Sequence, residues 1–96
     1  MDAASKDDIK RWFQEGVKDN QDRMIVVCDT YDWSDFPVYT KGLKEFTKRY
    51  LEIVSKDMNK VMEVYDLKMS LDFQMDEHRA FHYPEGFAEE NNVENI

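Results

Sequence analysis

Two histidines near the C-terminus have the spacing that most clearly suggests chemistry. His78 and His82 lie four positions apart, so a helix would place both imidazoles on one face, about one turn apart. Two imidazoles so placed are suited to Zn²⁺, although the HExxH motif, with its glutamate between the histidines, is absent. A complete site would need Cys28, Asp29 or Asp32. The alternative is that both histidines simply pack on an amphipathic helix.

Three aspartates follow an apolar run at regular spacing. Asp29, Asp32 and Asp35 form a D-x-x-D-x-x-D pattern, and converging carboxylates are ligands for Ca²⁺ or Mg²⁺. The spacing differs from that of an EF-hand, however, and Asp is favoured in turns because its side chain accepts local backbone N–H groups. We therefore expect a turn and no cofactor, with a divalent metal as the alternative.

The single cysteine is a weak candidate nucleophile. Cys28 would need His78 or His82 as its base, yet it ends the run Met24–Cys28, where a free cysteine is usually buried and unreactive. Three glycines are too few for a phosphate-binding loop. We therefore expect no catalysis, and a small metal-dependent hydrolase centred on His78, His82 and Asp29 is the alternative.

Aromatic residues gather around the same turn. Tyr31, Trp33 and Tyr39 combine apolar area with a hydrogen-bonding tip, which suits interfaces and stacked ligands. The alternative is that alternate residues point inward as core. We expect these three residues, with Asp29 and Asp32, to contact a ligand or partner.

Charge is unevenly distributed along the chain. The net charge is −8, which disfavours direct binding to nucleic acid or an anionic membrane. Residues 41–60, in contrast, hold six basic and three acidic side chains, and we expect Lys44, Lys48 and Arg49 to contact a partner. In an oligomer, this basic face of one subunit and the Tyr31–Trp33 segment of another could form a pocket for a nucleotide-like anion.

The elements that must position these residues indicate an α+β fold in the order α-β-β-α-β-α. We expect a small, mainly antiparallel sheet with helices packed on one face. Residues 1–83 form the single domain, and residues 84–96 form a solvated acidic tail. Hydrophobic periodicity predicts the elements Lys6–Asp19, Met24–Cys28, Phe36–Thr40, Leu43–Lys56, Lys60–Leu67 and Ser70–Phe81. The expected core consists of Ile9, Trp12, Phe13, Val17, Ile25, Val27, Phe46, Tyr50, Ile53, Val64 and Leu71.

Three segments also carry a resemblance. MIVVCDTYDWSDFPVY (24–39), VMEVYDL (61–67) and EHRAFHY (77–83) together resemble a family of small uncharacterised bacterial and phage proteins. The resemblance covers roughly Ile9 to Tyr83 and implies a bacterial or phage origin, but no site residues.

These observations predict a small acidic, non-enzymatic binding module that acts through protein–protein contact or self-association. The single cysteine, the polar N-terminus and the lack of a membrane-spanning apolar run favour the cytoplasm. An oligomeric binder of a nucleotide-like anion is the alternative within the same class.

Overall fold

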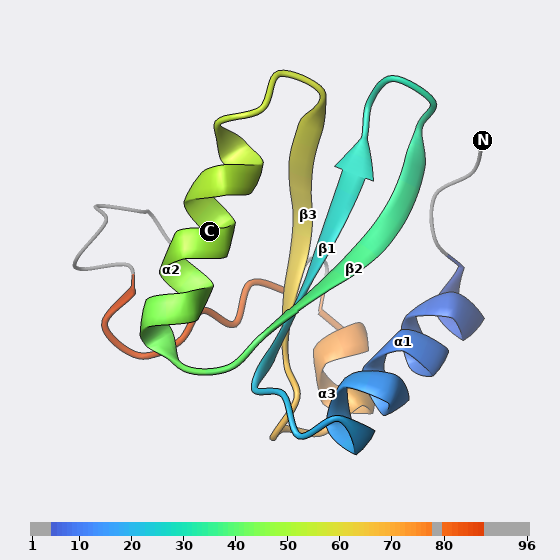
Figure 1. Cartoon of the computed structure of the whole chain (residues 1–96). Coiled ribbons are helices and arrows are strands. Elements are labelled where there is room, and N and C mark those ends of the chain that lie inside the picture. Colours follow the sequence, from blue (N-terminus) through green and yellow to red (C-terminus); the bar gives the residue numbers. More distant parts are fainter. Residues whose placement is uncertain (1–4, 78–79, 88–96) are drawn as a thin grey trace.

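The computed structural model describes residues 5–77 and 80–87 (Figure 1). The elements occur in the predicted order, which confirms the α+β class. They are α1 (Lys6–Lys18), β1 (Arg23–Asp29), β2 (Ser34–Thr40), α2 (Leu43–Val54), β3 (Asn59–Asp66) and α3 (Leu71–Met75).

The sheet is antiparallel with the strand order β2-β1-β3. β1 is central, which explains its unbroken apolar run, because its side chains are buried on both faces. The alternation expected for β3 holds except at one bulge, where Val26 pairs with Glu63 and Val27 with Val61. Met62 is the extra residue. Val61 therefore packs on the same side as Val64, not on the opposite side as strict alternation predicts.

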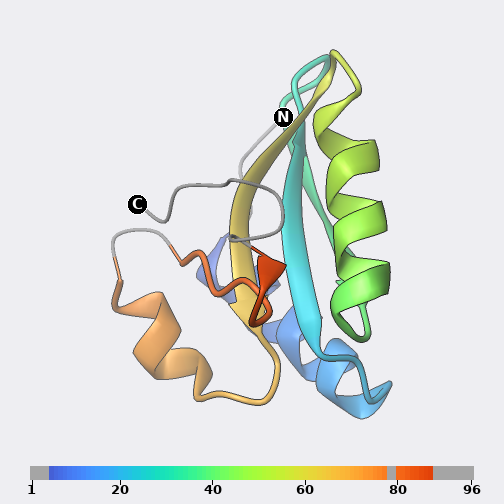
Figure 2. The same ribbon diagram turned by 90° about the vertical axis from the view of Figure 1, so that its left-hand side faces the viewer.

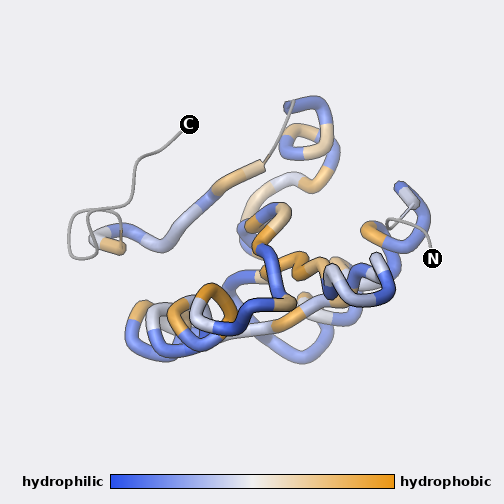
Figure 3. Tube along the Cα trace, turned by 90° about the horizontal axis from the view of Figure 1, so that it is seen from above, coloured by the Kyte–Doolittle hydropathy of each residue, from blue (hydrophilic) through white to orange (hydrophobic). Residues whose placement is uncertain are grey.

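Helices cover both faces of the sheet, so the expectation of helices on one face is wrong. Ile9 and Phe13 of α1 pack with Met24 of β1, and α3 adds to this side. Phe46 of α2 packs with Ile25 on the other side. Figure 2 shows α2 and α3 on opposite sides of the strands. In Figure 3 the hydrophobic stretches of the strands lie near the middle of the fold. The alternation of β1 thus builds two cores from a single strand.

The first helix begins with a capping box and passes close to the sheet. Ser5 Oγ accepts the Asp8 N–H, and the Asp8 carboxylate accepts the Ser5 N–H, both at 3.1 Å. At Gly16, a Cβ would lie 2.8 Å from Tyr39 and Leu67 side-chain atoms, so the glycine permits this close approach. Val17 is 49% exposed, which corrects its assignment to the core.

The C-terminal part of the fold departs furthest from expectation. The last helix covers only Leu71–Met75, and the chain turns at Asp76. Phe81 instead forms a parallel bridge to Val64 at the outer edge of β3. Phe87 is completely buried, so the domain extends past residue 83 and a solvated tail does not begin at 84. Residues 88–96, the rest of the expected tail, lie outside the described residues.

Candidate functional site

The loop between β1 and β2 is shaped by aspartate side chains. Asp29 Oδ1 accepts the Tyr31 N–H at 2.9 Å, and the main-chain oxygen of Asp29 accepts the Trp33 N–H at 2.7 Å. Asp32 Oδ1 accepts the Ser34 N–H and hydroxyl at 3.1 and 2.6 Å. These hydrogen bonds lower the pKa of Asp32 below its ordinary value. Asp29 and Asp32 therefore shape the turn, as predicted from the preference of aspartate for turns.

The turn directs two aromatic side chains into solvent. Tyr31 is 80% exposed and Trp33 is 62% exposed, and Trp33 has a left-handed backbone with φ 58°. Met58, from the loop between α2 and β3, is also exposed, and its carbonyl accepts the N–H and hydroxyl of Thr30 at 2.7 and 3.1 Å. We call residues 29–34 together with Met58 the hairpin tip; it lies at the top of Figure 1.

Tyr39 lies away from the tip, near the other end of β2. Its hydroxyl donates to the Trp12 carbonyl at 2.7 Å, which ties β2 to α1. Burial, followed by the charges of Glu15 and Asp19, raises the pKa of Tyr39 to about 12. The sequence predicted that Tyr31, Trp33 and Tyr39 contact the same partner, but the structure places Tyr39 on a different surface from the other two.

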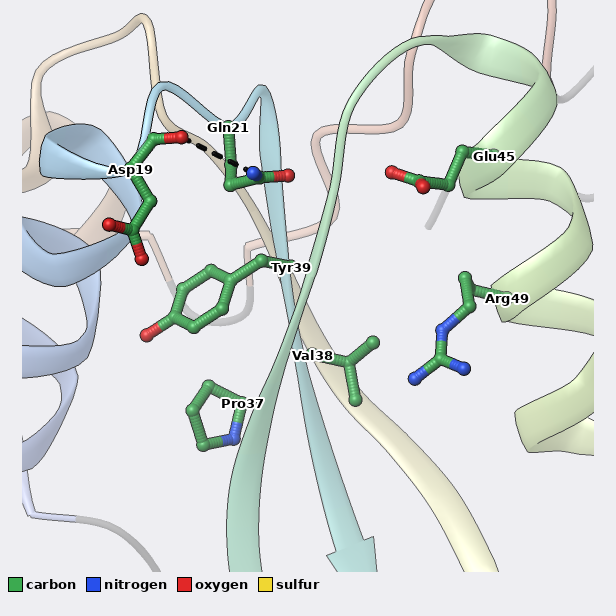
Figure 4. A pocket seen from close by; sticks show the side chains of 7 residues that line it. All are labelled: Asp19, Gln21, Pro37, Val38, Tyr39, Glu45 and Arg49. Carbon is green, nitrogen blue, oxygen red and sulfur yellow. Dashed lines mark hydrogen bonds between the residues drawn. The ribbon is translucent and has the colours of Figure 1, made fainter.

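That surface is a groove along β2, with a volume of about 470 Å³ (Figure 4). Pro37, Val38 and Tyr39 lie along its floor. Arg49 comes from α2, on the Val38 side, and Asp19 comes from the end of α1, on the Tyr39 side. Gln21 and Glu45 complete the lining.

The predicted basic set is divided between two sides of α2. Lys44 and Lys48, with Leu43 and Thr47, line a separate cavity of about 450 Å³, whereas Arg49 lines the β2 groove. Residues 44 and 49 are about 140° apart around a helix, which accounts for the separation. All three residues lie on α2, whose N-terminal end is at the opposite end of the fold from the hairpin tip (Figure 1).

The prediction that His78 and His82 lie on one face of a helix is wrong, because His82 is not in a helix. His82 lies in the extended segment beside β3, where its N–H donates to the Val64 carbonyl at 3.0 Å, and not on a helix. Its Nε2 contacts Glu77, and its carbonyl accepts Arg23 Nε at 2.8 Å. His78 lies outside the described residues. Among the described residues, no three His, Cys, Asp or Glu side chains are grouped so as to hold a metal.

The surroundings of the cysteine disfavour its reactive thiolate form. Cys28 is buried, and burial raises the pKa of its thiol, with a further contribution from Asp35. His82 lies beside Val64, whose partner in β1 is Ile25. Ile25 is three residues from Cys28, or about 10 Å along the strand, so His82 is not placed to act as its base.

Comparisons with protein-family models, curated proteins and solved structures found no match to the chain. The resemblance to bacterial and phage proteins therefore stays a prediction. Within the part of the chain that the structure describes, no helix is both long enough and apolar enough to cross a membrane.

Several residues at these surfaces were not among the predicted contacts. Met58 reaches the hairpin tip from a loop 25 positions after Trp33 in the sequence, and only the strand order brings the two loops to one end. Asp19 and Gln21 reach the groove because α1 packs beside β2. Glu45 carried a local signal, because it lies one turn before Arg49 on α2.

Proposed function

We propose that the chain is a non-enzymatic binding module and that the hairpin tip contacts a protein partner. The supporting observation is the exposure of Tyr31 and Trp33, at 80% and 62%, on a turn that hydrogen bonds hold in one shape. Trp and Tyr side chains dominate the binding energy of many interfaces. A positive φ at a residue as bulky as Trp33 is unfavourable. Such strain is usually retained where function uses the geometry.

The charge around the aromatic side chains indicates the chemistry of the partner. Acidic side chains outnumber basic ones in and beside the tip, where the charged residues are Asp29, Asp32, Asp35, Asp57, Lys56 and Lys60. The whole chain carries a net charge of −8. We therefore propose a partner with a basic surface around an apolar hollow that accepts the Trp33 ring. Such a contact weakens as salt concentration rises, because exposed charges are screened.

Affinity capture with a matched control tests this function. The resemblance makes a bacterial lysate the appropriate source of partners. The tip variant is Tyr31→Ser/Trp33→Ser. The control variant is Val17→Ser/Phe73→Ser, which replaces two exposed apolar side chains, 49% and 59% exposed, on α1 and α3.

We expect the wild type and the control to retain the same basic protein at low salt. The tip variant should retain it at least tenfold less, because aromatic anchors often contribute 2 kcal/mol or more. Native mass spectrometry would report the stoichiometry, including association of the chain with itself. Equal capture by the tip variant would contradict the proposal. The proposal would also be contradicted if the wild-type chain is a monomer in native mass spectrometry and captures no protein from the lysate.

A second candidate function is the binding of a nucleotide-like anion. The observation that favours it is the cavity beside Lys44 and Lys48, which has Leu43 in its lining. Thr47 also lines this cavity, and its Oγ1 is buried without a hydrogen-bond partner among the described residues. Calorimetric titration with ATP tests this candidate. Binding should be lost in Lys44→Gln/Lys48→Gln and preserved in the tip variant.

A further inference from the structure

The two acidic side chains of α2 already have partners. Glu45 lines the β2 groove, and its carboxylate accepts the Lys41 N–H at 2.6 Å. Glu52 contacts Arg49 at 3.5 Å, and Arg49 lines the same groove. The acidic groups of this helix are therefore engaged by the chain itself, and the side toward β2 carries charge of both signs.

The other side of α2 carries basic and apolar side chains. Lys44 and Lys48 line the cavity of about 450 Å³ with Leu43 and Thr47, and no described acidic residue is in this lining. Both lysines are exposed, and neither forms an ion pair with another described residue. Leu51 lies one turn after Thr47 and is 47% exposed. This side of the helix therefore offers two unpaired positive charges beside apolar surface.

The end of the described chain reaches the same helix. The ring centroid of Phe87 lies 4.9 Å from that of Phe46 and 5.0 Å from that of Tyr50, both on α2. The segment arrives along β3, where Phe81 bridges Val64, and β3 and β2 are opposite edges of the described sheet. The end of the described chain, red in Figure 1, lies on the side of α2 away from β2.

The residues that follow have the charge that this side of α2 lacks. Residues 88–96 lie outside the described residues, and their sequence is AEENNVENI, with three glutamates and no basic residue. An extended chain rises about 3.3 Å per residue, so Glu90 can be about 10 Å from Phe87. A helix with its side chains is about 10–12 Å across. The first glutamates can therefore reach the lysines from the buried ring.

We propose that residues 88–96 bind across this side of α2 and that Glu89 and Glu90 pair with Lys44 and Lys48. The chain would then supply its own anionic ligand for the lysines. This contact is separate from the hairpin tip, and its failure would leave the proposed function intact. An added anion, as in the second candidate function, would have to displace the segment.

The burial of Phe87 explains how exposed ion pairs can hold such a segment. Each exposed pair contributes little by itself, because water and salt screen the charges. A segment tethered beside its site by a short connection, however, has an effective concentration of about millimolar. Weak pairs therefore suffice when the preceding residue is fixed on the same helix.

Paramagnetic NMR on the full chain tests this contact. The change Asn92→Cys provides an attachment point for a nitroxide in ¹⁵N-labelled protein, and the native Cys28 is buried. A nitroxide broadens the signals of nearby amides. We expect strong broadening at Thr47 and Leu51, and none at Trp33, which belongs to the hairpin tip. High salt should reduce the broadening, because the pairs are exposed.

Charge reversal identifies the partners. Lys44→Glu/Lys48→Glu should lower the bound fraction about threefold or more, because two attractions become repulsions. Adding Glu89→Lys/Glu90→Lys should restore it. The matched control is Lys6→Glu/Lys10→Glu, which reverses two exposed lysines, also four positions apart, on α1. The control should leave the broadening unchanged, and thermal melts would check that each variant keeps its fold.

Several outcomes would overturn the inference. One is broadening at Thr47 no stronger than at Trp33. Another is broadening that persists in Lys44→Glu/Lys48→Glu, and a third is failure of the charge swap to restore it. A mixture of ¹⁵N-labelled protein without nitroxide and nitroxide-labelled protein without ¹⁵N detects contact between copies. Broadening at Thr47 in this mixture would assign the lysines to a second copy instead.

Discussion

Replacement of Phe87 by alanine tests whether the C-terminal segment is part of the core. The Phe87 ring is fully buried. Its centroid lies 4.9 Å from that of Phe46, 5.0 Å from Tyr50 and 5.1 Å from Tyr83. Two of these partners are on α2, so Phe87 fastens the end of the described chain to the helix that covers this face of the sheet.

The expected loss of stability follows from the burial. Removal of a fully buried phenylalanine side chain costs about 3–5 kcal/mol, because apolar contacts are lost and a cavity is left. At about 4 °C or more per kcal/mol for a domain of this size, Tm should fall by roughly 12 °C or more. The expected loss of about 3–5 kcal/mol is a large part of the free energy of unfolding, which is about 5–15 kcal/mol for a typical small domain.

Urea unfolding followed by circular dichroism measures this loss. Phe73→Ala is the matched control, because Phe73 is 59% exposed and its replacement should change stability by no more than about 0.5 kcal/mol. If Phe87→Ala does not fold, Phe87→Leu should show a smaller loss in the same direction. A cost below about 1 kcal/mol for Phe87→Ala, with an unchanged m-value, would refute the assignment of this segment to the core.

Two further predictions concern the contact between α1 and β2. Gly16→Ala adds a Cβ that would lie 2.8 Å from Leu67 and Tyr39 atoms. Despite the higher helix propensity of alanine, we expect a net loss of about 1 kcal/mol or more in urea unfolding, and a gain would contradict the close packing. The pKa of Tyr39 is raised to about 12, so its contribution is complete below the unfolded value near 10 and is lost as pH rises through 12. The stability of Tyr39→Phe should therefore fall less than that of wild type between pH 9 and 11.5, and equal slopes would contradict this.

The sequence was most informative where the pattern was local. The capping box at Ser5, the apolar run of β1 and the period of α2 each gave an element close to its observed bounds. The C-terminal region failed because its structure depends on distant partners. The local sequence around Phe81 predicts a continuation of the last helix, but in the fold Phe81 forms a β-bridge with Val64 of β3. Phe87 is a single aromatic in an acidic stretch, with no periodicity to mark it as core.

The candidate surfaces show the same limit. The turn at Asp29 and Asp32 was predictable because Asx hydrogen bonds span only two residues. The separation of Arg49 from Lys44 and Lys48 follows from helix geometry, but which side of α2 faces β2 depends on packing. The exposure of Trp33 was also undecided from sequence, because its left-handed backbone breaks the alternation of an ordinary hairpin.

The bulge in β3 gives the strand one place where its length can change. Removal of Met62 would leave Glu63 opposite Val26 and Val61 opposite Val27, as they are now, and every other side chain would keep its face. Loss of a β3 residue outside the range 61–63 would instead turn part of the strand over. Homologues that lack a single residue in this strand should therefore carry the deletion within residues 61–63, and a gap placed outside this range in their alignment would misassign the buried positions.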